Sequence, residues 1–462
     1  MTNQKHKNSQ RRKTKLQSVL QDANLRPKTA WTRWVLFVLL LGSFCLFQWN
    51  GGIVEFANSM AKNGIDAKNM DAAQWWINIA RTVSTSSGYT DFLQARTDRL
   101  NGRLDKMANH LKSAFEKNFD PAKLDREQTL ALATIGRLDD EVENKLNRWL
   151  KEPDAIHSDI IDAYANGLTA VSRFEHAAEL LQAWETSAPW EPTPHYRMAR
   201  LNEHLLQFQL AEDQYRMAIK KSPKFDKATY NLARLLLDQR RPDEAIKLYQ
   251  AITSKNGMIA AKIGIASCYK TLGETDRAKS LLEEVLKVPY DQHLQSYQSF
   301  DYAPERNIAA SELGGIEAEL GDYSAAKEHL ELALKSFPLD SIGRYSYAVA
   351  LRGLGLKEEA DRNFQIVRNA RESLDEVSTL QEVLRQNPKA TDARLKIGKI
   401  VLEHESERTG VFWIQSVFAY DPENQEAHKV LAEYYESKKT SEVDDQKIAA
   451  YHRSFIKKTT NK

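Results

Sequence analysis

The middle of the chain repeats a pattern of small and large positions every 34 residues. Three consecutive stretches show it without gaps, at 158–191, 192–225 and 226–259. In each stretch the eighth and twentieth residues are small and the twenty-fourth is large: Ala165, Ala177, Leu181; Ala199, Ala211, Tyr215; Ala233, Ala245, Tyr249. Proline stands at the thirty-second position in two of them, where it would end a helix because it lacks the N–H group and clashes with the preceding turn. The pattern predicts two helices per repeat.

The size of each position follows from the packing of two antiparallel helices. A small residue is needed where the paired helices cross closely, and a large residue fills the gap toward the next repeat. The same register extends outward, with further starts near residues 54, 88, 123, 259, 307, 341, 391 and 425. The sequence therefore predicts about eleven units over 54–462, broken by inserts near 290–306 and 375–390. We expect the first insert to be a loop, whereas the second suits an extra helix.

An uninterrupted apolar segment lies near the start of the chain. Residues Trp34–Trp49 read WVLFVLLLGSFCLFQW and contain no charge. Tryptophans flank the segment, as interfacial residues do. Extended through Val54, it reaches the roughly 17–25 residues that span a bilayer. The pattern predicts a transmembrane anchor over 31–53 after a basic, disordered tail over 1–30. A cleaved signal peptide and a buried soluble helix are the alternatives, but no small-x-small cleavage site follows closely and the segment has no polar face.

Charge is distributed unevenly along the chain. Residues 1–33 hold nine of the 65 Lys and Arg residues and one of the 63 acids. Positive charge on this side of the apolar segment predicts a cytoplasmic N-terminus, with the body in the periplasm or otherwise outside the cytoplasm. The remaining chain is mildly acidic, so nothing in its charge favours nucleic acid as a partner. The two cysteines, Cys45 and Cys268, exclude a four-thiolate zinc site, and we expect no disulfide between them.

The 34-residue period with these small positions is identified as the tetratricopeptide pattern. The stretches 92–121 and 124–146 resemble a group of planctomycete-type bacterial tetratricopeptide proteins with an N-terminal anchor. The layout of lead, anchor and repeats is also similar to the membrane-anchored periplasmic tetratricopeptide subunit that accompanies the bacterial secretion translocon. These resemblances imply an all-α fold, a right-handed superhelical solenoid of helical hairpins preceded by one transmembrane helix.

Catalytic sequence motifs are missing from the chain: it contains no HExxH, GxSxG, Walker A or GxGxxG. An enzyme would need convergent titratable groups at the first insert, which has only Asp291, His293, Asp301 and Glu305. Six tryptophans stand at or near packing positions of second helices and are expected to pack between helices or repeats: Trp75, Trp76, Trp149, Trp184, Trp190 and Trp413. The sequence predicts no enzyme, no cofactor and no metal site.

First helices of tetratricopeptide units line a concave face with positions 2, 5, 6, 9, 12 and 13. In the units starting at 192 and 226 these positions bring together bases, an amide and tyrosines: Tyr196, Arg197, Arg200, Lys227, Tyr230, Asn231 and Arg234. Such a set can hold a carboxylate or another anionic segment, since Arg forks bind bidentately and Tyr supplies rigid contact area. It resembles in residue type the clamp that some tetratricopeptide domains use for a C-terminal carboxylate. The alternative is that these bases only pair with acids along their own helices.

A solenoid without catalytic groups is typical of proteins that bind other proteins. The first hypothesis is a membrane-anchored scaffold or adaptor that mediates protein–protein interaction or complex assembly at the cell envelope. The second is an ancillary periplasmic chaperone or envelope-biogenesis factor that binds extended clients. The breadth of partners distinguishes them, because one stoichiometric partner favours a scaffold and many weak apolar clients favour a chaperone.

Overall fold

The structure is a computed structural model that describes residues 51–151, 157–387, 389–438 and 443–456. These residues form α-helices and one short 3₁₀ helix, with no strand among them, which confirms the all-α prediction. The chain has two compact units, whose described parts lie within 51–93 and 94–456, and the boundary falls within helix α5 (Gly88–Leu100). Each unit is described by itself.

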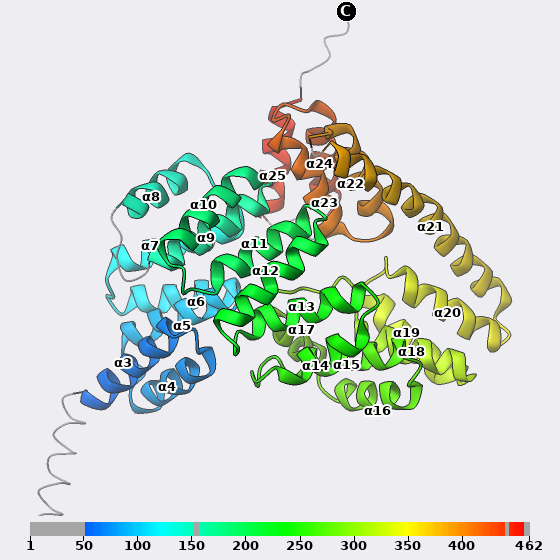
Figure 1. Cartoon of the computed structure of the whole chain (residues 1–462), viewed down its shortest axis with the longest axis horizontal. Coiled ribbons are helices and arrows are strands. Elements are labelled where there is room, and N and C mark those ends of the chain that lie inside the picture. The colour runs from blue at the N-terminus through cyan, green and yellow to red at the C-terminus, as the bar shows by residue number, and fades with distance from the viewer. Residues whose placement is uncertain (1–50, 152–156, 388, 439–442, 457–462) are drawn as a thin grey trace, which may run out of the picture. The chain divides into compact units, whose positions relative to one another are not determined.

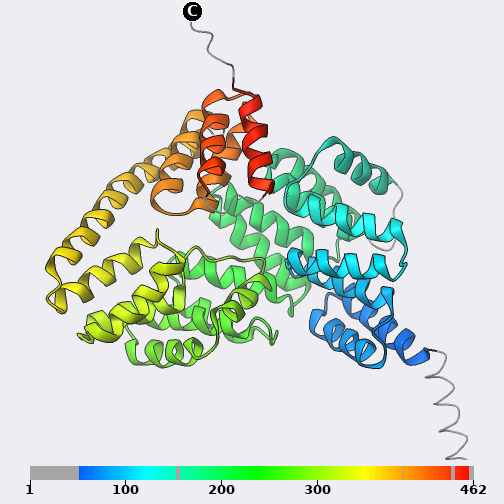
Figure 2. The ribbon, with the colours of Figure 1, turned by 180° about the vertical axis from the view of Figure 1, so that it is seen from behind.

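The first unit contains one complete helical hairpin. Helix α3 (Gly52–Asp66) packs against α4 (Met70–Val83), and the two lie side by side in both views (Figures 1 and 2). Ala61 and Ala73, at the predicted small positions, are completely buried. A side chain at Gly64 would meet the backbone of Ala73, because the Cβ of a larger residue would lie 2.9 Å from the Ala73 nitrogen. The hairpin therefore needs small residues where its helices cross.

The second unit continues as successive helices that contact their neighbours along the chain. The helices up to the first insert are α6 (Leu104–Glu116), α7 (Pro121–Thr134), α8 (Asp140–Lys151), α9 (His157–Ala170), α10 (Phe174–Ser187), α11 (Thr193–His204), α12 (Phe208–Lys221), α13 (Asp226–Asp238), α14 (Pro242–Ala251), α15 (Met258–Thr271) and α16 (Thr275–Leu286). Beyond them lie α17 (Tyr290–Gln298), α18 (Ile308–Leu320), α19 (Tyr323–Ser336), α20 (Ser341–Gly353), α21 (Lys357–Gln386), α22 (Thr391–His404), α23 (Glu407–Gln415), η1 (Ser416–Ala419), α24 (Gln425–Ser437) and α25 (Val443–Ser454).

The core of the second unit is built from the positions that the repeat pattern singled out. Each of the six alanines at the eighth and twentieth positions of the three regular repeats is at most 1% exposed. The large residues at the twenty-fourth positions are also buried, at 0–3%. Tyr249 shows why its neighbour must be small, since a Cβ on Gly264 would lie 2.4 Å from the Tyr249 ring. The packing explanation of the repeat pattern is confirmed at these positions.

The first insert differs from the sequence-based expectation, and the second is helical as expected but forms no separate helix. Residues 290–298 form helix α17 instead of a loop, and only the following residues are irregular. The buried His293 accounts for part of this order, because its Nε2 donates to the carbonyl of Val285 at 2.9 Å. Residues 375–386 are the continuation of α21, which runs for 30 residues without a glycine or proline to end it (Figures 1 and 2).

The structure does not test the predicted membrane anchor, and it corrects part of the prediction for the tryptophans. The predicted anchor over 31–53 lies outside the described residues except for its last three, and Gly52 and Ile53 already belong to α3. None of the helices in the described part of the chain is both long and apolar enough to cross a bilayer. The packing prediction for the tryptophans is correct for Trp184 and Trp413 but wrong for Trp75 and Trp190, which are 57% and 71% exposed.

Candidate functional site

The seven residues predicted to line a groove converge in the structure, and they surround a segment of the same chain. The segment is Phe300–Tyr302, which follows α17 in the first insert. It contacts side chains from α11 and α13, although about 70 to 105 residues separate the partners along the chain. We call this arrangement the Asp301 groove and define it by Tyr196, Arg197, Arg200, Lys227, Tyr230, Asn231 and Arg234.

A carboxylate lies at the centre of the Asp301 groove. Lys227 Nζ is 2.7 Å from one carboxylate oxygen of Asp301, and Arg197 Nη1 is 3.1 Å from the other. The hydroxyl of Tyr196 donates to that second oxygen at 3.1 Å. Arg200 Nη1 donates to the main-chain carbonyl of Asp301 at 2.8 Å. The groove thus binds both the charge and the backbone of an acidic residue.

Aromatic stacking fixes the residues on either side of the carboxylate. The Phe300 ring stacks on Tyr230, with centroids 4.2 Å apart and planes 7° apart. Asn231 Nδ2 donates to the Phe300 carbonyl at 2.8 Å. The guanidinium of Arg234 lies 5.4 Å from the centre of the Tyr302 ring, a cation–π distance. Phe300 is only 1% exposed, so the segment belongs to the hydrophobic core as well as to the groove.

The surrounding charges set the protonation of the groove. Burial alone raises the pKa of Asp301, but the positive charges of Lys227 and Arg197 outweigh it and hold that pKa well below its usual range. Burial also lowers the pKa of His204, to about 3, with help from the charges of Arg200 and Arg234. His204 is therefore neutral at physiological pH, and Asp301 is ionised.

The basic residues of the Asp301 groove were predicted either to bind a carboxylate or only to pair with acids of the helices. Arg234 pairs with Glu203 of the neighbouring helix α11 and with Asp238 of its own helix α13, and both acids were named in the alternative interpretation. Lys227 and Arg197, however, hold a carboxylate from a distant part of the chain. Carboxylate binding by these residues is thus seen within the chain. Partner binding at the same place stays a prediction, because a partner would have to displace Phe300–Tyr302.

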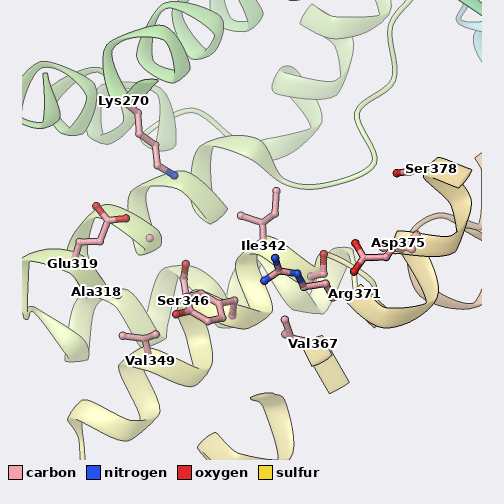
Figure 3. Close-up of a pocket in the computed structure, with 14 residues that line it drawn as sticks. Lys270, Ala318, Glu319, Ile342, Ser346, Val349, Val367, Arg371, Asp375 and Ser378 are labelled. Carbon is pink, nitrogen blue, oxygen red and sulfur yellow. The ribbon is translucent and has the colours of Figure 1, made fainter. Parts of the chain in front are cut away.

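A second groove lies farther along the repeats, and the sequence analysis did not single it out. It is a cavity of about 670 Å³ lined by residues of α15, α18, α20 and α21 (Figure 3). Ile342 and Tyr345 line it and are 56% and 54% exposed. They stand at positions 2 and 5 of the repeat starting at 341, the positions used to choose the first set. The same positional rule would therefore have found this open groove.

Two cations and two carboxylates line the open groove. Lys270 extends from α15, Glu319 from α18, and Arg371 with Asp375 from α21 (Figure 3). None of these four side chains forms an ion pair with a described residue. Gly315 lies in the wall, where an added Cβ would come no closer than 3.4 Å to another side chain. The open groove combines exposed apolar surface with charged groups of both signs, which suits a protein segment.

Comparison with family models identifies the repeats. Two models described as tetratricopeptide repeat match the chain, one at residues 196–258 and 311–360 and the other at 259–291. No protein of curated function matches the chain in sequence.

Solved structures with similar helical arrays include three from different sources. A human IFIT1 dimer with m7Gppp-AAAA is 15% identical, with a TM-score of 0.39, and the match covers 80% of this chain and 89% of that one. The C-terminal part of a repeat protein from Cytophaga hutchinsonii is 17% identical, with a TM-score of 0.33 and coverages of 58% and 98%. YrrB, described as a TPR protein with an unusual peptide-binding site, is 18% identical, with a TM-score of 0.25 and coverages of 47% and 96%.

The chain thus carries tetratricopeptide repeats over 196–291 and 311–360, within a body that is all-helical where it is described.

Proposed function

We propose that this chain is a membrane-tethered scaffold that holds a segment of a partner protein in the open groove. The observation that carries the proposal is that exposed apolar side chains and charged side chains of both signs line one cavity. Ile342 and Tyr345 offer apolar surface, which water leaves on binding. Lys270 and Arg371 offer cations that can pair with carboxylates of a partner. A cavity of about 670 Å³ is large enough for several side chains of such a segment.

The Asp301 groove supports this proposal by example. It shows that the inner faces of these repeats bind an aromatic–acidic–aromatic segment through cations, backbone contacts and ring stacking. The open groove repeats the same ingredients with different side chains, since it has two cations and the ring of Tyr345. Because Glu319 and Asp375 line the open groove beside these cations, a partner segment that carries charges of both signs next to an apolar residue fits it best.

Membrane tethering is the second part of the proposal. Its support is the uncharged segment Trp34–Trp49 with tryptophans at its ends and a basic lead before it. The basic lead favours a cytoplasmic N-terminus and a repeat body on the other side of the membrane, in the periplasm of a bacterial cell. Extraction of membranes at alkaline pH tests the tether, because an integral protein stays in the pellet. Release of the full chain into the supernatant would contradict it.

Site-specific photocrosslinking tests the open groove. A photoreactive amino acid replaces Tyr345 in the full chain in native membranes, and a control replaces Leu332, which is similarly exposed at 49% and does not line the groove. We expect a crosslink to one reproducible polypeptide from position 345 alone. Ile342→Glu should abolish that crosslink, whereas Leu332→Glu should preserve it. Equal crosslinking from both positions, or none from position 345, would contradict a partner in this groove.

The same experiment separates the scaffold from the chaperone alternative. A scaffold gives one crosslinked product in amounts close to that of the chain itself. A chaperone gives many weak products with apolar segments, and their set changes when the synthesis of envelope proteins is blocked. Neither outcome depends on the membrane tether, because alkaline extraction tests the tether in a separate experiment.

A further inference from the structure

The first hairpin exposes aromatic rings where a repeat array normally ends in polar surface. Phe56 on α3 and Trp75 on α4 are 54% and 57% exposed, and Trp76 beside them is half-buried. The Phe56 and Trp76 rings are 5.6 Å apart and the Trp75 and Trp76 rings 4.5 Å apart, so the three form one cluster. Terminal repeats need a polar outer face for solubility, because no further repeat covers them. An exposed aromatic cluster here indicates that something apolar covers it.

The place of the cluster in the chain indicates what covers it. Helix α3 begins at Gly52, directly after the apolar segment proposed as the membrane anchor. Phe56 is four residues into α3, so at 1.5 Å per residue its Cα lies within about 6 Å of the start of the helix, whatever the tilt. The headgroup layer on each side of a bilayer is about 5–8 Å thick. If the anchor spans the membrane, Phe56 cannot leave the interfacial layer by more than a few ångströms.

The type of side chain favours a lipid surface over a second protein. Tryptophan rings prefer the membrane interface, where the apolar ring meets the acyl region and the N–H meets the headgroups. Phe and Trp side chains bury 150–250 Å² each, so the two half-exposed rings here offer only about 200–300 Å². A stable protein interface needs about 800 Å² per partner. The rings by themselves supply less than half of such an interface, whereas shallow insertion into a headgroup layer needs no larger apolar surface.

Charge on the hairpin does not require an anionic membrane. Exposed α3 residues include Glu55, Lys62 and Asp66, and Lys62 already pairs with Asp66. The mixture is close to neutral, so the contact depends on the rings and not on attraction to acidic lipids.

We propose that the aromatic cluster of Phe56, Trp75 and Trp76 lies in the lipid headgroup layer and holds the first hairpin against the membrane surface. This inference rests on the proposed tether. The cluster adds a second contact with the bilayer beside the anchor and restrains the hairpin at the point where the repeat body starts.

Depth-dependent quenching tests the proposal on the full chain in lipid nanodiscs of neutral phosphatidylcholine. In a background without Cys45 and Cys268, single cysteines replace Phe56, Trp75 or, as a control, Lys62, and carry an environment-sensitive fluorophore. Lys62 is on the same helix, about 9 Å beyond Phe56 and 120° around the axis. A nitroxide on the lipid headgroup should quench positions 56 and 75 at least about twofold more strongly than position 62.

The possible results separate the inference from the tether on which it rests. Discs are first washed at alkaline pH, and loss of the chain at that step would contradict the tether itself. If the chain is retained, equal quenching at position 62 and at either aromatic position overturns the aromatic contact. Strongly blue-shifted emission at position 56 without quenching by lipid also overturns it, because protein and not lipid would then cover the cluster.

Discussion

Replacement of Asp301 by asparagine tests the central contact of the Asp301 groove. The change removes one negative charge and almost no volume. It also adds no backbone strain, because Asp301 has a φ of 54° and asparagine tolerates this left-handed region well. The ion pairs to Lys227 and Arg197 are lost, while an amide oxygen can still accept one hydrogen bond. The variant therefore isolates the charge of the segment held in the groove.

The size of the effect follows from how many charges are left without a partner. Breaking a buried ion pair costs about 3–5 kcal/mol, because the remaining charge is desolvated and unpaired. The Lys227 and Arg197 side chains are 24% and 13% exposed, so solvent screens part of this cost. Arg197 also keeps its two-pronged contact with Asp162, at 2.6 and 2.9 Å. Lys227 keeps a hydrogen bond to the Leu100 carbonyl at 3.3 Å but loses its carboxylate partner, and we expect a loss of about 2 kcal/mol.

Hydrogen exchange of the full chain in detergent measures this loss locally. Peptides that cover residues 296–304 should exchange roughly 30-fold faster in Asp301→Asn, because 1.4 kcal/mol is a factor of ten in an opening equilibrium. Asp291→Asn is the matched control, since Asp291 is an exposed acid of the same insert, in the first turn of α17. It should change exchange by less than about 0.5 kcal/mol. Equal exchange in the two variants would refute the idea that Asp301 organises the groove.

Three further changes test other contacts of the body. Folding lowers the pKa of Asp301, so its contribution to stability is complete above the unfolded pKa of about 3.9 and is lost as pH falls below that value. The loss of helical signal on acidification, followed by circular dichroism, should therefore depend less steeply on pH in Asp301→Asn than in the wild type. Gly264→Ala should cost about 1–3 kcal/mol in urea unfolding, because the new methyl group would overlap the Tyr249 ring. Gly315→Ala is the matched helical control and should cost much less, because its Cβ would come no closer than 3.4 Å to another side chain. His452 Nδ1 is 2.8 Å from His428 Nδ1, and burial and the neighbouring imidazole lower the pKa of His452 to about 4. Below about pH 6.5 the unfolded chain binds a proton at His452, whereas the folded chain does so only near pH 4, so acidification destabilises the folded state. Peptides of α25 should therefore lose protection from hydrogen exchange between pH 6.5 and about 4, and His452→Phe should remove this pH dependence.

The repeat positions could be predicted from the sequence because their cause is local. A small residue such as Ala199 or Ala233 is required by the helix that follows it in the same repeat, and the 34-residue period records this requirement three times in succession. The direction of Tyr196, Arg197 and Lys227 followed from the same geometry. Tetratricopeptide matches begin at residue 196 and so cover the second and third of these repeats but not the first, and the described helices agree with the register in all three.

The occupation of the groove could not be predicted in this way, because no period relates an insert to the repeats that it contacts. Lys227 and Asp301 are 74 residues apart, and Arg197 and Asp301 are 104 apart. One signal was present in the composition. The first insert places an acid between two aromatic residues, Phe300 and Tyr302, which complements the bases and tyrosines of the predicted set. The sequence wrongly predicted that Trp75 and Trp190 are buried. The repeat register identifies a packing position, but such a position is buried only if a neighbouring element covers it.

The insert also decides which groove is available to a partner. Phe300–Tyr302 are joined to the Asp301 groove by the chain itself, and a segment tethered in this way has an effective concentration of about 1 mM. A partner that makes the same contacts at about 1 μM competes at roughly a thousandfold disadvantage and occupies the groove in about one molecule in a thousand. The buried Phe300 ring increases this disadvantage, because its removal also opens the core. The open groove is a cavity, and within the described chain no insert segment fills it as Phe300–Tyr302 fills the Asp301 groove. If the proposed function holds, a partner of ordinary affinity selects the open groove, and one that enters the Asp301 groove must make contacts that the insert does not.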